Sequence, residues 1–218
     1  MEFETILERS DPPVRGYLHR SKETKNALVL THGAGGNARM SLLVALAEAF
    51  VDSGIAVLRC DLPFRQERAF GPPRPGQAER DRVGLKRAVE YVRGLVSGRV
   101  FLGGQSYGGR QATMLCAEQP ALVDGMLLLS YPLHAPGKPE QLRVQHFPEL
   151  KAPCLFVQGT RDPFGSIDEM ESALRLVAGR TELMRVENAG HDLGFKGKAK
   201  RVELPGMVVS QFGRFVRE

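Results

Sequence analysis

Residues 103–110 read Gly-Gly-Gln-Ser-Tyr-Gly-Gly-Arg and contain the spacing G-x-S-x-G centred on Ser106. This pattern is typical of a sharp turn from a strand into a helix, where glycines on both sides let the neighbouring backbone approach without a clash from a Cβ atom. The strand-like residues 100–102 precede the turn, and a helical stretch over residues 110–118 follows it. This context favours a nucleophile elbow that presents Ser106, rather than a glycine-rich connection with no chemical role.

Short apolar runs bounded by Gly, Pro, Asp or Ser occur on both sides of this turn. Runs of this length predict strands that are buried on both faces of a sheet. They cover residues 27–31, 55–60, 100–102, 125–129 and 154–158, and a further strand-like run covers residues 182–186. Between the runs, apolar residues recur at helical spacing. The clearest examples are residues 42–50, 85–96 and 208–215.

Strands and helices therefore alternate along the chain. This order predicts a doubly wound α/β fold, with a mostly parallel sheet, right-handed crossovers and helices on both faces. Residues 5–7 and 14–19 predict an antiparallel start to the sheet. A chain of 218 residues is longer than a minimal domain and shorter than two ordinary ones. We therefore expect a single domain over residues 1–218.

The composition excludes several classes of protein. With 42% hydrophobic and 25% charged residues, the chain is unlike a disordered protein. Its apolar runs are far shorter than the roughly 20 residues of a membrane span, and its start, Met-Glu-Phe-Glu, lacks the features of a secretory signal. Cys60, Cys116 and Cys154 lie far apart, which predicts neither a disulfide framework nor a cysteine zinc site. We expect a cytoplasmic protein with no membrane partner.

The charge pattern does not indicate a nucleic-acid partner. The 30 basic and 25 acidic residues give a net charge of +5, and the two signs are interleaved, as in residues 79–82. Such interleaving is typical of solvated surface. The glycine-rich residues 33–36 lack the Lys-Ser/Thr of a phosphate-binding P-loop. The sequence thus predicts no nucleic acid, no nucleotide, no metal ion and no other cofactor.

An acid and a histidine follow the serine in the order that serine chemistry needs. A serine hydroxyl is a weak nucleophile unless a base accepts its proton and a third group orients that base. Asp162 comes shortly after the predicted strand that ends at residue 158, and His191 comes after the next one. Loops at the carboxyl ends of parallel strands gather at one edge of the sheet, so we expect Ser106, Asp162 and His191 to meet there. The acids that compete with Asp162 are Asp124, Asp168 and Asp192.

Two further sets of residues are candidates for contacts with a substrate. The backbone N–H groups of Ala34 and Tyr107 could stabilise a developing oxyanion, since one follows the first parallel strand and the other follows Ser106. Arg65 and Arg68 lie in a loop that leaves a parallel strand at its carboxyl end. They are candidate ligands for an anionic substrate group, with a solvated surface role as the alternative.

Four motifs carry a resemblance to a known family. They are THGAGGN at residues 31–37, GGQSYGGR at 103–110, GTRDPFG at 159–165 and NAGHDLGF at 188–195. In this order they resemble the α/β-hydrolase superfamily, in particular its small lidless serine hydrolase branch, which includes dienelactone-hydrolase-like proteins and the TEX and KANSL-type predicted hydrolases. The resemblance covers nearly the whole chain.

The resemblance implies a catalytic triad of Ser106, Asp162 and His191 and an oxyanion hole at Ala34 and Tyr107. Dienelactone hydrolases carry a cysteine at the elbow where this chain has a serine, so their substrate does not transfer to it. Some eukaryotic members of the branch look like subunits of larger assemblies.

Larger hydrolases insert a helical cap at the place occupied here by residues 131–151. This stretch contains four prolines in about 20 residues, which is too short and too interrupted for a cap domain. The site should therefore be open. The leading hypothesis is a serine hydrolase that cleaves a small carboxylic ester or thioester through an acyl-enzyme. The main alternative is a non-catalytic binding or scaffold protein that keeps the fold, and a peptidase is a third.

Overall fold

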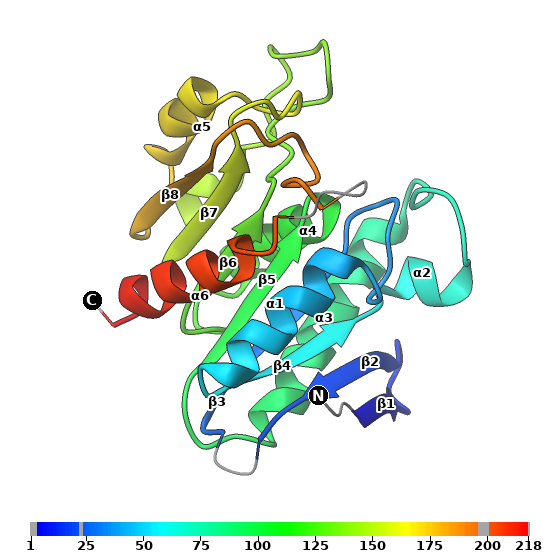
Figure 1. Ribbon diagram of the computed structural model, residues 1–218. Coiled ribbons are helices and arrows are strands. Elements are labelled where there is room, and N and C mark those ends of the chain that lie inside the picture. The colour runs from blue at the N-terminus through cyan, green and yellow to red at the C-terminus, as the bar shows by residue number, and fades with distance from the viewer. Residues whose placement is uncertain (1–3, 22–23, 196–200, 218) are drawn as a thin grey trace.

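The computed structural model of the chain describes residues 4–21, 24–195 and 201–217 (Figure 1). Its centre is an eight-stranded sheet with the order β1-β2-β4-β3-β5-β6-β7-β8. The strands are β1 (Glu4–Glu8), β2 (Val14–His19), β3 (Asn26–Thr31), β4 (Ile55–Cys60), β5 (Val100–Gln105), β6 (Met126–Leu129), β7 (Cys154–Gly159) and β8 (Thr181–Val186). β2 pairs antiparallel with β1 and β4, and all other neighbouring strands pair parallel.

Helices cover both faces of this sheet. They are α1 (Ser41–Asp52), α2 (Pro63–Glu67), α3 (Gln77–Arg93), α4 (Tyr107–Glu118), α5 (Ile167–Leu174) and α6 (Leu204–Phe215), with a short 3-10 helix η1 (Phe147–Glu149). α1 and α6 share one apolar cluster and lie in front of the sheet in Figure 1. α3, α4 and α5 contribute to the cluster on the opposite face. The predicted doubly wound α/β fold is confirmed.

The central strands have no side that meets solvent. Every residue of β5, β6 and β7 is buried, because helices cover both faces and a neighbouring strand lies on each edge. This burial explains why these strands read as unbroken apolar runs in the sequence. It also holds their carboxyl ends rigidly at one edge of the sheet, where the loops that carry Ser106 and Asp162 begin.

Several element boundaries differ from those predicted. The helix expected over residues 85–96 ends at Arg93, because Gly94 weakens the helix there and Leu95 and Val96 lie beyond it. The short helix α2 falls in a stretch that we expected to be a loop. Its fifth residue, Glu67, ends it after little more than one turn, too few residues to show a helical period.

The segment between β6 and β7 contains the 3-10 helix η1 and no other helix or strand, so the expectation of no cap domain holds for this fully described stretch. None of the helices in the described ranges has the length and apolar character needed to cross a bilayer.

Candidate active site

Ser106 occupies the turn between β5 and α4. Its backbone angles are φ 51° and ψ −117°, a strained combination for a residue with a side chain. A Cβ atom on Gly104 would lie 2.7 Å from the backbone nitrogen of Gly109, and one on Gly108 would lie 2.4 Å from the carbonyl oxygen of His32. Only glycine fits at these two positions, which is the physical reason for the G-x-S-x-G spacing.

The structure brings the predicted serine, histidine and aspartate together at the carboxyl edge of the sheet. Ser106 Oγ lies 2.8 Å from His191 Nε2. On the other side of the imidazole, Nδ1 lies 2.8 Å and 3.0 Å from the two carboxylate oxygens of Asp162. In the neutral ring, Nδ1–H therefore donates to Asp162, and Nε2 is free to accept the serine proton.

Asp162 is held by more than the histidine. Its side chain is fully buried, Oδ2 accepts a hydrogen bond from Gln158 Nε2 at 3.1 Å, and Oδ1 accepts one from the backbone N–H of Phe164 at 2.9 Å. The Phe164 ring stacks on the imidazole of His191 with centroids 4.1 Å apart. These contacts fix the orientation of both the carboxylate and the imidazole before any substrate binds.

The competing acids have other surroundings. Asp168 is exposed in the first turn of α5. Asp124 accepts a hydrogen bond from the backbone N–H of Val100, at the amino end of β5 and so at the opposite edge of the sheet. Asp192 lies beside the histidine in sequence, and its Oδ1 accepts a hydrogen bond from the Gly194 N–H. The carboxylate that hydrogen-bonds to His191 Nδ1 is that of Asp162.

The two predicted oxyanion-hole residues lie beside the serine. Ala34, Tyr107 and Ser106 all line one cavity. A Cβ atom on Gly33 would lie 3.3 Å from Ser106 Cβ, so the loop that carries Ala34 passes directly against the serine. The Tyr107 hydroxyl donates a hydrogen bond of 2.7 Å to Asp81, a buried carboxylate on α3 that also accepts one from the Phe64 N–H.

Comparison with known proteins identifies the family. Residues 24–206 match the sequence profile of the alpha/beta hydrolase domain family. The chain belongs to this family. Among similar solved structures, the dienelactone hydrolase from Anabaena variabilis is 20% identical over 98% of each chain, with a TM-score of 0.77. Est1E from Butyrivibrio proteoclasticus is 14% identical over 98% of this chain and 99% of its own, with a TM-score of 0.78. A lidless α/β serine hydrolase from Xanthomonas campestris is 16% identical over 98% and 95%, with a TM-score of 0.75.

Arg65 and Arg68 do not line the cavity of this α/β hydrolase, which corrects the expectation that they face a substrate. Arg65 is buried, and its guanidinium donates to the carbonyl oxygens of Ala34, Gly36, Gly71 and Arg68 at 2.7–3.1 Å. Arg68 is half-buried and donates to the carbonyl of Pro72. Arg65 therefore has a structural role, because its hydrogen bonds join the glycine-rich loop beside Ser106 to the loop after α2.

We expect Arg65→Met to lower the free energy of unfolding by about 2–4 kcal/mol, because the carbonyls of a buried network lose their charged donor. The loop that carries Ala34 should also loosen, so kcat for an activated ester should fall about tenfold. Urea unfolding and ester kinetics measure the two effects. Arg68→Met is the matched control and should stay within about 0.5 kcal/mol of the parent. Equal effects of the two substitutions would contradict this role for Arg65.

His32 stabilises the same loop as a neutral ring. Its Nδ1 lies 2.8 Å from the Gly33 carbonyl, to which it donates, and its Nε2 accepts the Leu62 N–H at 3.1 Å. Burial lowers the pKa of His32 to about 4, although the Gly33 carbonyl and Asp61 oppose that shift. Protonation of Nε2 would place a proton against the Leu62 N–H, so the charged ring does not fit this arrangement.

This pKa predicts a loss of stability in acid. Between about pH 6.5 and pH 4 the unfolded chain binds a proton at His32 that the folded chain does not bind, so lowering the pH favours unfolding. The loss should reach on the order of 3 kcal/mol for this residue once the pH is below 4. Urea unfolding at pH 7.5 and 4.5 measures it. The variant His32→Gln should lose less stability over the same interval, and an unchanged pH dependence would contradict the assignment.

The cavity beside Ser106 has a volume of about 730 Å³. Apolar side chains such as Met40, Leu42 and Phe195 form part of its wall, together with His191. Arg110 and Arg143 also line it. Sequence reasoning missed both arginines. The position of Arg110, four residues after Ser106 on a helix, was a usable signal, whereas nothing in the sequence indicated Arg143.

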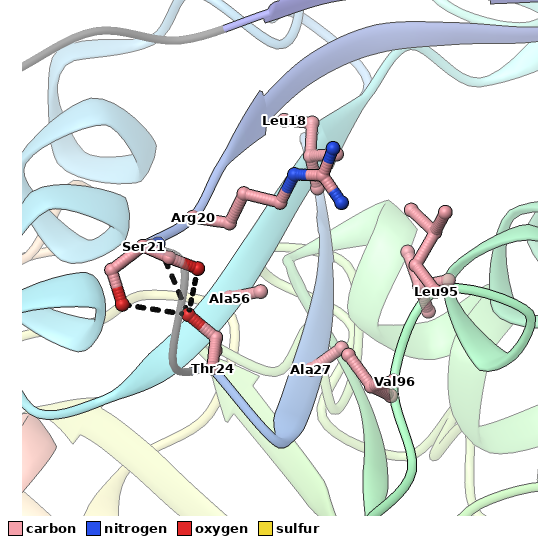
Figure 2. Close-up of a pocket in the computed structure, with 9 residues that line it drawn as sticks. Leu18, Arg20, Ser21, Thr24, Ala27, Ala56, Leu95 and Val96 are labelled. Carbon is pink, nitrogen blue, oxygen red and sulfur yellow. Dashed lines mark hydrogen bonds between the residues drawn. The ribbon is translucent and has the colours of Figure 1, made fainter.

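Figure 2 shows a second, smaller cavity of about 360 Å³, lined in part by Leu18, Ala27 and Leu95. Ala27 lies near the amino end of β3, so this cavity is at the opposite edge of the sheet from Ser106. Its marked hydrogen bonds join Ser21 and Thr24 to each other. It is therefore separate from the candidate active site.

Proposed function

We propose that this α/β hydrolase cleaves a small carboxylic ester or thioester through an acyl-enzyme intermediate. The observation that supports the proposal is the continuous hydrogen-bonded series from Ser106 Oγ through His191 to the buried carboxylate of Asp162. Ser106 and His191 are partly exposed and border an open cavity, so an ester carbonyl can reach the hydroxyl.

The reaction would follow from this geometry. His191 Nε2 accepts the proton as Ser106 Oγ attacks the carbonyl carbon, and the N–H groups of Ala34 and Tyr107 stabilise the oxyanion that forms. The imidazolium then donates its proton to the departing alcohol or thiol. A water molecule repeats the sequence on the acyl-enzyme and releases the acid. Asp162 holds the tautomer of His191 throughout, and no step needs a metal ion or cofactor.

Labelling with a fluorophosphonate probe tests the proposal. Intact mass measurement should show one adduct on the parent protein and none on Ser106→Ala. Ser41 lines the same cavity at the start of α1, so Ser41→Ala is the matched control and should still be labelled. A folded parent protein that takes up no probe would instead favour a binding or scaffold role.

We also propose that the enzyme is a single domain that works in the cytoplasm. Its three cysteines, Cys60, Cys116 and Cys154, are free and buried, as expected for a protein of a reducing compartment. Burial raises the pKa of the Cys60 and Cys116 thiols to about 12, so neither is a nucleophile at neutral pH.

A further inference from the structure

Two arginines from separate elements line the cavity beside Ser106. Arg110 comes from the first turns of α4, and Arg143 comes from the segment between β6 and β7. That segment stands where larger hydrolases carry a cap. In this protein it brings a cation to the site, and the proposed hydrolysis gives that cation no role.

Arg110 is placed by the same helix that places the serine. It follows Ser106 by four residues, and its backbone N–H donates to the Ser106 carbonyl at 2.9 Å, so Arg110 lies in the first turn of the helix that begins directly after the serine. The Nε–H of Arg110 is buried and has no hydrogen-bond partner among the residues that the structure describes. Buried donors in proteins are nearly always paired, so the unpaired Nε–H of Arg110 is unusual.

Arg143 is fixed by contacts at both ends. Its backbone N–H donates to the Leu133 carbonyl at 2.8 Å, and its own carbonyl accepts the Tyr131 hydroxyl at 2.8 Å. The guanidinium donates to the Pro132 carbonyl through Nη1 at 3.3 Å, and within the described part of the chain most of its other donors have no acceptor. The side chain is therefore held against the cavity wall with its charge available.

The surroundings of this pair are short of negative charge. Arg110 and Arg143 line the same cavity, and burial and then the charge of Arg110 lower the pKa of Arg143. Burial, Arg110 and Arg82 also lower the pKa of His146 to about 4, so that neighbour is neutral at pH 7. Arg82 has a partner in Glu118, but neither Arg110 nor Arg143 has an ion pair within the described ranges.

Asp192 is the one acidic residue among the described residues that line the cavity. Its Oδ1 accepts a hydrogen bond from the Gly194 N–H at 3.1 Å, within its own loop. Two cations held together in a partly buried wall cost free energy unless an anion joins them. A guanidinium presents two parallel donors that match the oxygens of a carboxylate or phosphate.

We infer that Arg110 and Arg143 together bind a negatively charged group of the substrate, so that the ester or thioester cleaved at Ser106 carries a carboxylate or phosphate within a few bonds of the scissile carbonyl. This inference rests on the proposed function. It assigns the recognition of charge to these two arginines, in place of Arg65 and Arg68.

Matched esters test the inference. Mono-(4-nitrophenyl) adipate has a carboxylate on its acyl chain, and 4-nitrophenyl 6-methylheptanoate is a neutral ester of the same shape. An ester with a phosphonate in place of the adipate carboxylate distinguishes a phosphate site from a carboxylate site. A second pair, 4-carboxyphenyl acetate and 4-methylphenyl acetate, places the charge on the leaving group instead of the acyl chain. The parent enzyme should favour an anionic ester in at least one pair, mainly through a lower KM.

The arginine variants should remove this preference. Arg110→Met and Arg143→Met should each lower the ratio of kcat/KM for the anionic ester over the neutral one by about 10- to 100-fold. Arg143→Lys should keep part of the preference, since lysine keeps the positive charge but lacks the two parallel donors of a guanidinium. Arg87→Met, on the surface of α3, removes the same unit of charge and should leave the ratio unchanged. Thermal unfolding of each variant identifies any that fail to fold.

A binding measurement separates this inference from the proposed hydrolysis. Calorimetry should detect adipate or a phosphonate binding to Ser106→Ala, and the binding should disappear when Arg143→Met is added. If no ester is hydrolysed but the anion still binds in this manner, the arginine site stands and the proposed function fails. The arginine site is overturned if no anion binds and the esters are hydrolysed either with the same anionic preference in all variants or with no anionic preference in any of them. The proposed hydrolase function would still stand in that case.

Discussion

Replacing Ser106 by alanine is expected to lower kcat for 4-nitrophenyl acetate by at least ~10³-fold, while the melting temperature stays within a few degrees of the parent. The hydroxyl is partly exposed, and its hydrogen bond joins it to His191, so its removal takes away the nucleophile and little packing. Steady-state kinetics and thermal unfolding measure the two effects.

The backbone at Ser106 offers a matched control. Alanine keeps a Cβ atom at φ 51° and so keeps the strain, whereas glycine adopts that angle freely. We therefore expect Ser106→Gly to be as inactive as Ser106→Ala but to melt at a higher temperature, because the energy stored at the elbow is released. Turnover that survives in both variants would mean that another group is the nucleophile.

The features that were predicted correctly have their physical origin in burial, in backbone sterics or in the topology of the sheet. β5, β6 and β7 are buried on both faces and so had to be apolar throughout, and the elbow needs glycine where a Cβ atom would strike the backbone. The meeting of Ser106, Asp162 and His191 followed from topology. Each follows the carboxyl end of a parallel strand, and those ends share one edge of the sheet.

The residues that were missed or misplaced depend on contacts between distant segments. An arginine after a strand looks the same in the sequence whether it points to a substrate, as predicted for Arg65, or ties the Ala34 and Gly71 carbonyls together. Arg143 lies in a proline-broken stretch with no period, and only the folded path of that stretch brings it near Ser106. Burial of a charged group is a tertiary property, so composition and spacing do not reveal it.

Asp81, however, is a buried charged residue whose burial could have been predicted from the sequence. It lies four residues before Leu85 on α3, so the two side chains share one helical face, and Leu85 is in the core. A carboxylate on an apolar face must find donors there, and this one accepts from the Tyr107 hydroxyl and the Phe64 N–H. An acid on the buried face of a predicted amphipathic helix is thus a signal for a group that positions its neighbours.

Replacing Asp162 by asparagine should cost about 10⁴-fold in kcat, because the amide can hold His191 in the tautomer that presents no base to Ser106. The structure adds a second effect. One carboxylate oxygen accepts from Gln158 Nε2 and the other from the Phe164 N–H, so the NH2 group of asparagine faces a donor in either orientation. We therefore expect the free energy of unfolding to fall by about 1–3 kcal/mol as well.

Two other asparagine variants make this prediction specific. Asp168 is exposed in the first turn of α5, where Ser166 and Glu169 already form the capping box, so Asp168→Asn should lose only the interaction of a charge with the helix dipole, about 0.5 kcal/mol, and no measurable rate. Asp192→Asn keeps an oxygen that can accept the Gly194 N–H, so its kcat should stay within about tenfold of the parent. Kinetics of the three variants on one activated ester, with the folded fraction of each measured by urea unfolding, rank the acids. The orienting carboxylate would have to be reassigned if Asp168→Asn or Asp192→Asn lost more activity than Asp162→Asn, because the hydrogen bonds to His191 Nδ1 would then not be the ones that set its tautomer.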